Sequence, residues 1–371
     1  MDPALRTTAL TARHEAAGAR LADFAGWSMP LWFAGALQEH AAVRDRAGVF
    51  DVSHLGTVEV VGPDAVAVVA ATCTNDAALL DDGGSQYTLC CDDQGGIVDD
   101  LLVYRLAPDR LLAVPNAANI AAVVAALDEA ATQRHAEVVD RSSEQAILAL
   151  QGPDSLDLAD RCLAALGAPA RSASVIPRNR VASAELDDGT RLLVCRTGYT
   201  GERGIEVVLD LAAAPRVWEA LVAAGAEPCG LAARDTLRLE MGYPLHGQEL
   251  STATTPVEAR LGWAVALDRG PFRGREALRA ARSHGPARLL WGLVATGRRP
   301  LRAGLEVRAR DGTLLGSTTS GSLSPTLGVP IALAYLATEV GPGDRVEVDV
   351  RRRPLPAEVV RPPFVDRDPS T

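Results

Sequence analysis

The chain has 371 residues, of which 47% are hydrophobic and 23% are charged, a composition typical of soluble globular proteins. Its formal net charge of −10 argues against nucleic acid as the main partner. All 37 basic residues are arginine, which excludes Schiff-base chemistry on lysine and a P-loop with its lysine.

The sequence shows no pattern typical of a membrane span, a signal peptide or a metal site. No apolar run reaches the ~20 residues of a membrane span, and the first residues lack the layout of a signal peptide. The six cysteines form no C-x-x-C pair and the six histidines are scattered, so no metal is expected. We therefore expect a cytoplasmic, monomeric protein that binds neither a membrane nor nucleic acid.

Strand and helix patterns alternate in the first part of the chain. TVEVVG (57–62) is typical of a strand, and PDAVAVVAATC (63–73) is typical of a helix that begins at a proline. YTLCC (87–91) and IVDDLLVYR (97–105) predict a hairpin. A further strand (111–116) and an amphipathic helix (118–134) are expected to follow.

Residues 146–167 repeat this order of strand, G-P-D and helix. Later patterns predict strands at 191–198 and 204–210 and helices at 213–225 and 229–242. From about residue 285 onward the patterns are those of strands with few helical signals. The sequence therefore predicts an α+β fold with a mostly β C-terminal domain.

Two adjacent aspartates, Asp99 and Asp100, interrupt the apolar strand at 97–105. Side chains alternate between the faces of a strand, so the two carboxylates should point to opposite sides and cannot form one acid–base pair. A four-residue loop at 92–95 would place Tyr87 opposite Asp100. From spacing alone, either both carboxylates cap turns or face solvent, or one of them faces a site.

A glycine-rich stretch, RTGYTGERGIEV (196–207), permits close approach of a ligand to the backbone. Within it, Glu206 lies between apolar strand residues and needs a partner, either an arginine or a ligand with adjacent N–H groups. Arg234 and Arg238 share one stripe of the following helix. They either pair with nearby carboxylates such as Glu240 or present a fork to a polar ligand.

Arginine is concentrated in one segment of this acidic chain. Between Arg269 and Arg310 there are eleven arginines and only two acidic residues. The segment is either a solvated, arginine-rich surface or a docking site for an acidic partner.

Several stretches together resemble the aminomethyltransferase family, the T-protein of the glycine cleavage system. They occur in the order of that family, and the resemblance extends from about residue 5 to residue 365. The stretches are FAGWSMP (24–30), EHAAVRDRAGVFDVSHLG (39–56), GGIVDDLLVYR (95–105), LALQGP (148–153), GYTGERGIE (198–206), CGLAARDTLRLEMGYPLHGQEL (229–250) and TSGSLSPTLG (319–328).

The resemblance implies a three-domain cloverleaf around a central folate cavity. The implied domains are 1–52 with 142–250, 53–141 with 251–280, and a β-barrel-like domain at 285–366. The implied reaction moves the one-carbon unit of an aminomethyl group from a lipoylated carrier, the H-protein, to tetrahydrofolate. Its products are 5,10-methylenetetrahydrofolate, ammonia and the dihydrolipoyl carrier.

The resemblance also implies roles for individual residues. Asp100 would be catalytic, and Asp99 would have a structural role. Glu206 would bind the amino and ring N–H groups of the pterin, and Arg302 matches an arginine near the lipoyl entrance. The implied folate-binding positions are Leu55, Tyr87, Asp100, Tyr104, Asn116, Tyr199, Glu206, Arg234 and Tyr243.

The sequence departs from the family pattern at a few positions. Leu55 replaces a methionine of similar volume, so binding should survive, and Arg203 replaces an acidic residue. An alternative with the same fold is a folate-dependent demethylase of sarcosine, dimethylglycine or a related methyl donor. An iron–sulfur assembly factor is disfavoured, because its cysteine-containing K-G-C-Y-x-G-Q-E motif corresponds here to the loop RTGYTGERG, which has Thr197 and no lysine.

Overall fold

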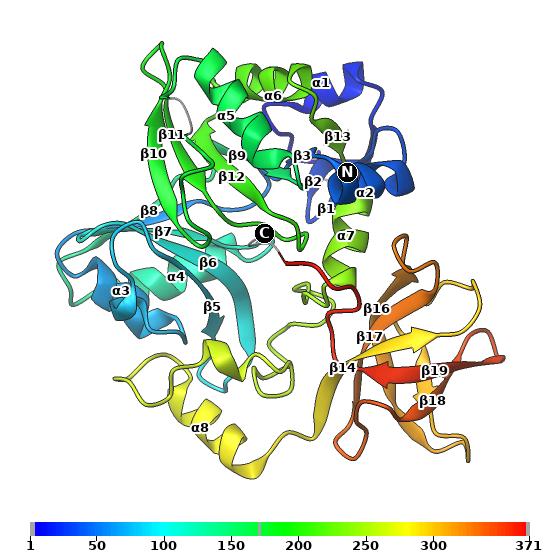
Figure 1. The fold of residues 1–371 in the computed structure, drawn as a ribbon. Coiled ribbons are helices and arrows are strands. Elements are labelled where there is room, and N and C mark those ends of the chain that lie inside the picture. The colour runs from blue at the N-terminus through cyan, green and yellow to red at the C-terminus, as the bar shows by residue number, and fades with distance from the viewer. Residues whose placement is uncertain (1–3, 170–171, 369–371) are drawn as a thin grey trace.

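The computed structural model describes residues 4–169 and 172–368, and these residues form three large sheets and one small one (Figure 1). The six-stranded sheet has the order β10 (Val181–Glu185), β11 (Arg191–Cys195), β12 (Gly204–Asp210), β9 (Gln145–Gln151), β3 (Gly48–Asp51) and β13 (Glu227–Cys229). The five-stranded antiparallel sheet has the order β5 (Ser85–Cys91), β6 (Ile97–Ala107), β7 (Arg110–Val114), β4 (Val58–Val61) and β8 (Glu137–Asp140).

The third large sheet is a closed barrel near the C-terminus. Its strands are β14 (Arg288–Ala295), β17 (Pro330–Ala337), β16 (Leu314–Leu323), β15 (Glu306–Arg308), β18 (Arg345–Asp349) and β19 (Pro354–Val360). A two-stranded sheet of β1 (Arg20–Phe24) and β2 (Trp27–Trp32) lies near the N-terminus. The predicted α+β class with a mostly β C-terminal part is confirmed, whereas the predicted domain boundaries stay a prediction.

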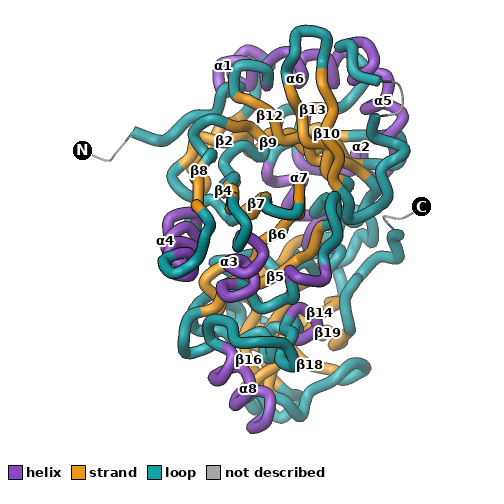
Figure 2. The backbone as a smooth tube through the Cα atoms, turned by 90° about the vertical axis from the view of Figure 1, so that its left-hand side faces the viewer, coloured by secondary structure: helices purple, strands orange, loops and turns teal. Residues whose placement is uncertain are grey.

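Helices cover the outer faces of the two α+β sheets. Helices α5 (Ser155–Ala165) and α6 (Ala214–Ala223) pack on the six-stranded sheet, and α3 (Ala65–Thr72) and α4 (Ile120–Ala131) pack on the five-stranded sheet. Figure 2 shows the barrel grouped at one end of the molecule and the six-stranded sheet at the other. The remaining helices are α1 (Thr11–Ala16), α2 (Ala36–Asp45), α7 (Leu231–Glu240), α8 (Arg275–His284) and the short 3-10 turns η1 (Ala77–Leu79) and η2 (Gly262–Ala264).

Strand β9 explains how the two α+β sheets come together. Leu148 and Leu150 pack in the core beneath α5 and α6, whereas Ile147 and Ala149 belong to a second core on the opposite face. That second core includes Tyr104 of β6. A central strand buried on both faces requires a nearly continuous apolar run, which AILALQ supplies. The two sheets therefore pack against each other, which brings β6 and β12 to the same cavity.

The repeated strand, G-P-D and helix order has a structural cause. Gly62 and Gly152 have φ angles of +131° and +127°, which favour glycine over residues with a side chain. A Cβ at either position would approach a backbone carbonyl oxygen to 2.5 Å, that of His135 or that of Arg46. Each glycine thus lets the chain turn closely from a strand into the following helix.

The register of the β5–β6 hairpin corrects a sequence prediction. Tyr87 pairs with Leu102, and Leu89 rather than Tyr87 lies opposite Asp100. The loop is one residue longer than expected, because Cys91 pairs with Ile97, and a β-bulge follows at Cys90. The longer loop and the bulge each shift the pairing of the two strands by one residue. Because the total shift is two residues, Tyr87 keeps the predicted face and lies diagonal to Asp100.

The helix predicted at 229–242 begins later than expected. Cys229 belongs to β13, where it pairs in parallel with Phe50, and α7 begins at Leu231. Between them, the backbone N–H of Gly230 donates a hydrogen bond of 2.8 Å to the buried carboxylate of Glu39. This tertiary contact ends the strand and fixes the start of α7.

A buried ion pair on α7 generates a stability prediction. Glu240 is fully buried and accepts hydrogen bonds from Arg44 (2.9 Å), the Ser324 hydroxyl (2.5 Å) and the Thr326 N–H (3.0 Å). Glu240→Ala leaves the Arg44 charge buried without this acceptor, so we expect a loss of about 3–5 kcal/mol in the free energy of unfolding. Urea denaturation measures the change.

The matched control is Glu219→Ala, because Glu219 forms an exposed ion pair with Arg13 at 2.7 Å. Exposed pairs contribute little, so the control should lose less than about 1 kcal/mol. Equal losses from the two substitutions would contradict the assigned role of Glu240.

Candidate functional site

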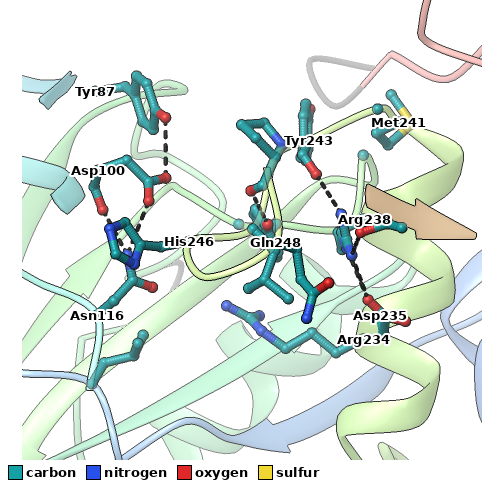
Figure 3. Close-up of a pocket in the computed structure, with 18 of the residues that line it drawn as sticks. Tyr87, Asp100, Asn116, Arg234, Asp235, Arg238, Met241, Tyr243, His246 and Gln248 are labelled. Carbon is teal, nitrogen blue, oxygen red and sulfur yellow. Dashed lines mark hydrogen bonds and ion pairs between the residues drawn. The ribbon is translucent and has the colours of Figure 1, made fainter. Parts of the chain in front are cut away.

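A cavity of about 1460 Å³ lies where the three large sheets meet. Its walls come from β5, β6, the loop before β12, helix α7 and the barrel strand β16. Figure 3 shows Tyr87 and Asn116 near Asp100 on one side of this cavity, and Arg234 on the α7 side. The predicted residues that line it are Leu55, Tyr87, Asp100, Asn116, Tyr199, Glu206, Arg234, Tyr243 and Arg302.

Asp100 lies in this cavity, held by two hydrogen bonds. Its Oδ2 accepts a hydrogen bond of 3.0 Å from the Tyr87 hydroxyl, and its Oδ1 accepts one of 3.0 Å from Asn116 Nδ2. Burial raises the pKa of Asp100, against these hydrogen bonds and the nearby His246, which lower it. Asp99 is fully buried and does not line the cavity, so the two carboxylates do face opposite sides of β6.

Glu206 lies in the cavity wall at the end of a hydrogen-bond chain. The Thr197 hydroxyl donates its single proton to Glu206 Oε2 at 2.6 Å. The Thr197 oxygen therefore accepts a hydrogen bond from the Tyr104 hydroxyl at 2.7 Å. Tyr104 is only 2% exposed and does not line the cavity. The structure thus places Tyr104 behind the predicted site, where it orients Thr197.

The two arginines of the α7 stripe have different environments. Arg238 is 2% exposed and forms ion pairs with Glu249 at 3.1 Å and Asp235 at 2.8 Å. Arg234 lines the cavity, and its buried Nη1 has no hydrogen-bond partner among the described residues. The sequence left open whether these arginines pair internally or face a ligand. Arg238 pairs internally with carboxylates. Arg234 instead has a guanidinium nitrogen in the cavity wall without a partner among the described residues.

Aromatic rings form the floor beside Arg234. Its guanidinium carbon lies 4.9 Å from the centre of the Tyr199 ring, and Tyr199 stacks on Tyr243 with ring centres 5.7 Å apart. The Tyr199 hydroxyl donates to the backbone carbonyl of Pro244. The ring is therefore fixed, and the arrangement offers a cationic and aromatic surface to a flat ligand.

Sequence reasoning missed other residues of the cavity. Trp263 is 67% exposed and stacks on Tyr87 at 5.4 Å, although no local pattern marks this lone tryptophan. His246 lies in the stretch PLHG and acts electrostatically on Asp100. Arg178 and Arg361 also line the cavity, and both are exposed. Both arginines are far in sequence from the predicted residues of the cavity, so no local pattern indicated that they line it.

The remaining wall residues differ in depth. Leu55 is partly buried, and it packs with the core that lies between the two α+β sheets. Arg302 is exposed at the barrel side of the cavity and donates to the Leu301 carbonyl at 3.0 Å. Within residues 4–169 and 172–368, no group of three metal-binding side chains lies together, and no helix could cross a membrane.

Comparisons with known proteins agree with this architecture. Residues 10–269 match the GCVT N-terminal domain, and residues 288–366 match the glycine cleavage T-protein C-terminal barrel domain. The chain is 51% identical over 371 residues to the aminomethyltransferase of Frankia alni, with 98% of this chain and 99% of the relative covered. It is 47% identical over 359 residues to that of Mycobacterium tuberculosis, with 95% of each covered.

A solved structure gives the same result. The crystal structure of the glycine cleavage system aminomethyltransferase T from Bartonella henselae superposes with a TM-score of 0.90 at 36% identity. The alignment covers 98% of this chain and 99% of the other. The fold and the cavity thus define an α+β enzyme with a C-terminal barrel. The chain belongs to the glycine cleavage T-protein family, the aminomethyltransferases, which confirms the predicted family and enzyme class.

The Tyr87–Asp100 contact predicts a pH effect. The Tyr87 hydroxyl favours the ionised form of Asp100, so its removal in Tyr87→Phe should raise the Asp100 pKa further. Activity that needs the carboxylate falls as the pH drops through this pKa. We therefore expect the acid limb of the kcat/KM profile to move to higher pH by about 1 unit.

The control is Tyr104→Phe, which removes a hydroxyl that contacts Thr197 rather than Asp100. The acid limb of the kcat/KM profile of Tyr104→Phe should lie at the same pH as in the wild type, even if the variant binds its substrate more weakly. An unchanged acid limb in Tyr87→Phe would show that the hydroxyl does not control the Asp100 charge.

Proposed function

We propose that the protein transfers the one-carbon unit of an aminomethyl group from the lipoyl arm of a carrier protein to tetrahydrofolate. Ammonia, 5,10-methylenetetrahydrofolate and the dihydrolipoyl carrier are the products. One observation carries the proposal beyond family membership. A carboxylate of raised pKa, Asp100, shares one cavity with a recognition set formed by Glu206, Arg234 and Tyr199.

The chemistry of the cavity fits a folate. A pterin carries adjacent amino and ring N–H donors, and Glu206 Oε1 accepts no hydrogen bond from the described residues. The buried, unpartnered Nη1 of Arg234 can donate to a carbonyl or ring nitrogen. The volume of about 1460 Å³ exceeds the ~300–1000 Å³ of common ligand pockets. The excess leaves room for the arm of a second substrate.

The roles of the residues follow from these contacts. Tetrahydrofolate supplies the two amine nitrogens that receive the carbon. Asp100 stabilises the positive charge that develops on the carbon under attack, since a fixed carboxylate in a shielded cavity is effective there. Tyr87 and Asn116 donate to opposite oxygens of Asp100, which orients the carboxylate and favours its ionised form.

A strip of arginines is the proposed approach for the carrier. Arg298, Arg299 and Arg302 are exposed and form no ion pair with the described residues. Arg299 donates to the Val350 carbonyl at 3.5 Å, so the strip continues into the exposed arginines at 351–353. Because Arg302 also lines the cavity, an acidic carrier docked on this strip would lie near the opening.

We further propose that the protein is cytoplasmic and monomeric. Its six cysteines are free and buried, which suits a reducing compartment.

The decisive experiment is a carrier-dependent ammonia assay. Purified protein should release ammonia from an aminomethylated lipoyl carrier only when tetrahydrofolate is present. Asp100→Asn should lower kcat at least about 100-fold, because it removes the charge that stabilises the transition state, while the thermal unfolding midpoint changes little. Turnover of sarcosine or dimethylglycine, without ammonia release from the carrier, would instead support the demethylase.

The arginine strip predicts a selective change in KM. Charge reversal at Arg298, Arg299 or Arg302 should raise the KM for the carrier several-fold and leave the KM for tetrahydrofolate unchanged. The control is Arg191→Glu, because Arg191 is 87% exposed on the six-stranded sheet, outside the strip. A carrier KM that stays at the wild-type value in all strip variants would place the docking surface elsewhere.

A further inference from the structure

The buried partner of the aspartate pair has an unusually specific environment. Asp99 is 0% exposed, on the face of β6 opposite Asp100. Its Oδ2 accepts the backbone N–H of Asn116 at 3.0 Å, and its Oδ1 accepts Nδ2 of Asn116 at 2.8 Å. Nδ2 of Asn119 donates to the same Oδ1 at 2.6 Å. A buried carboxylate is tolerated only with such donors, and all three come from the loop between β7 and α4.

These contacts determine which way the Asn116 amide points. Its Nδ2 lies 2.8 Å from Asp99 Oδ1, 3.0 Å from Asp100 Oδ1 and 2.9 Å from the Asp100 carbonyl. All three neighbours are acceptors, so only the NH₂ end can face them. The carbonyl oxygen of Asn116 must therefore point the other way. It accepts no hydrogen bond from the described residues, and Asn116 lines the cavity.

We propose that Asp99 is a positioning residue that fixes the Asn116 amide in this orientation. One N–H of the amide then holds Asp100, and the amide carbonyl is offered to an N–H donor of the ligand in the cavity. The inference rests on the proposed function, because it assigns a role beside the same Asp100. It replaces a passive structural role for Asp99 with control of the geometry on the opposite face of the strand.

The alternative orientation shows why the carboxylate matters. If the Asn116 amide rotated by half a turn, its carbonyl oxygen would meet the acceptor oxygens of Asp99 and Asp100. Burial and the neighbouring Asp100 raise the pKa of Asp99 to about 7, and above this pH its ionised carboxylate makes that orientation unfavourable, because it binds both the main-chain and the side-chain N–H of Asn116. An asparagine at position 99 has one acceptor and one donor end, so it cannot hold all three N–H groups.

The test begins with Asp99→Asn, which keeps the shape and removes the second acceptor. We expect kcat to fall on the order of 100-fold, as for a small misplacement of a reacting group, with the KM for the carrier unchanged. Affinity for 5-methyltetrahydrofolate, a folate with a blocked nitrogen, should weaken several-fold. Quenching of tryptophan fluorescence measures this binding without turnover, since Trp263 lines the cavity.

A double-mutant cycle separates positioning from general stability. If Asp99 acts through Asn116, then Asp99→Asn combined with Asn116→Ala should lose no more activity and no more folate affinity than Asn116→Ala alone. A merely structural role predicts additive losses together with a lower thermal midpoint. The control is Glu59→Gln, because Glu59 is a buried carboxylate of the same sheet that pairs with Arg110 at 2.8 Å outside the cavity.

The outcomes distinguish this inference from the proposed function. Wild-type kcat in Asp99→Asn, or additive losses in the cycle, overturns the positioning role. If the wild-type protein does not release ammonia from the carrier, the proposed function is wrong. The role of Asp99 is then decided by 5-methyltetrahydrofolate affinity alone, which in the double variant should be no weaker than in Asn116→Ala. If Asp99→Asn does not fold, Asp99→Ser, which retains a small acceptor, enters the same cycle.

Discussion

The buried charges on the last turn of α7 are the constraint on which the site depends. Glu240 binds Arg44 of α2 and also Ser324 and Thr326 of the loop after β16. Two residues earlier, Arg238 donates to Glu249 and to Ser320 of β16. Because removal of either partner would leave a buried charge, α7 has little freedom between the α+β part and the barrel. The same helix carries Arg234 into the cavity, so these pairs set one wall of the site.

Hydrogen bonding distinguishes Glu249 from two charged residues of the cavity wall, Glu206 and Arg234. Both oxygens of Glu249 are used, since Oε1 accepts from Thr319 and Oε2 accepts from Arg238 and from the Leu245 N–H. By contrast, Glu206 Oε1 accepts nothing from the described residues, and Arg234 Nη1 is buried without a partner. A buried polar atom without a partner is costly, so the proposed ligand would satisfy Arg234 Nη1 and could also donate to the free oxygen of Glu206.

The aspartate pair shows how local rules and tertiary contacts combine. Strand alternation alone assigns Asp99 and Asp100 to opposite faces, and the structure agrees. It does not say which face lines the cavity. That is decided by the loop between β7 and α4, which supplies three N–H groups to Asp99, and by Tyr87, which donates to Asp100. The asparagines of that loop are not identifiable from the spacing of GGIVDDLLVYR, whereas the hairpin spacing places Tyr87 on the correct face.

The sequence by itself determined the element order, the α+β class, the β-rich C-terminal part and the family, because hydrophobic periodicity and motif order are local properties of the chain. It also gave the correct face for Tyr87, since a register shift of two residues preserves the face. Only the tertiary structure decided the actual register, the start of α7 and the different environments of Arg234 and Arg238. These depend on a bulge, on the carboxylate of Glu39 and on acceptors distant in the chain, and such contacts exist only once the sheets have packed.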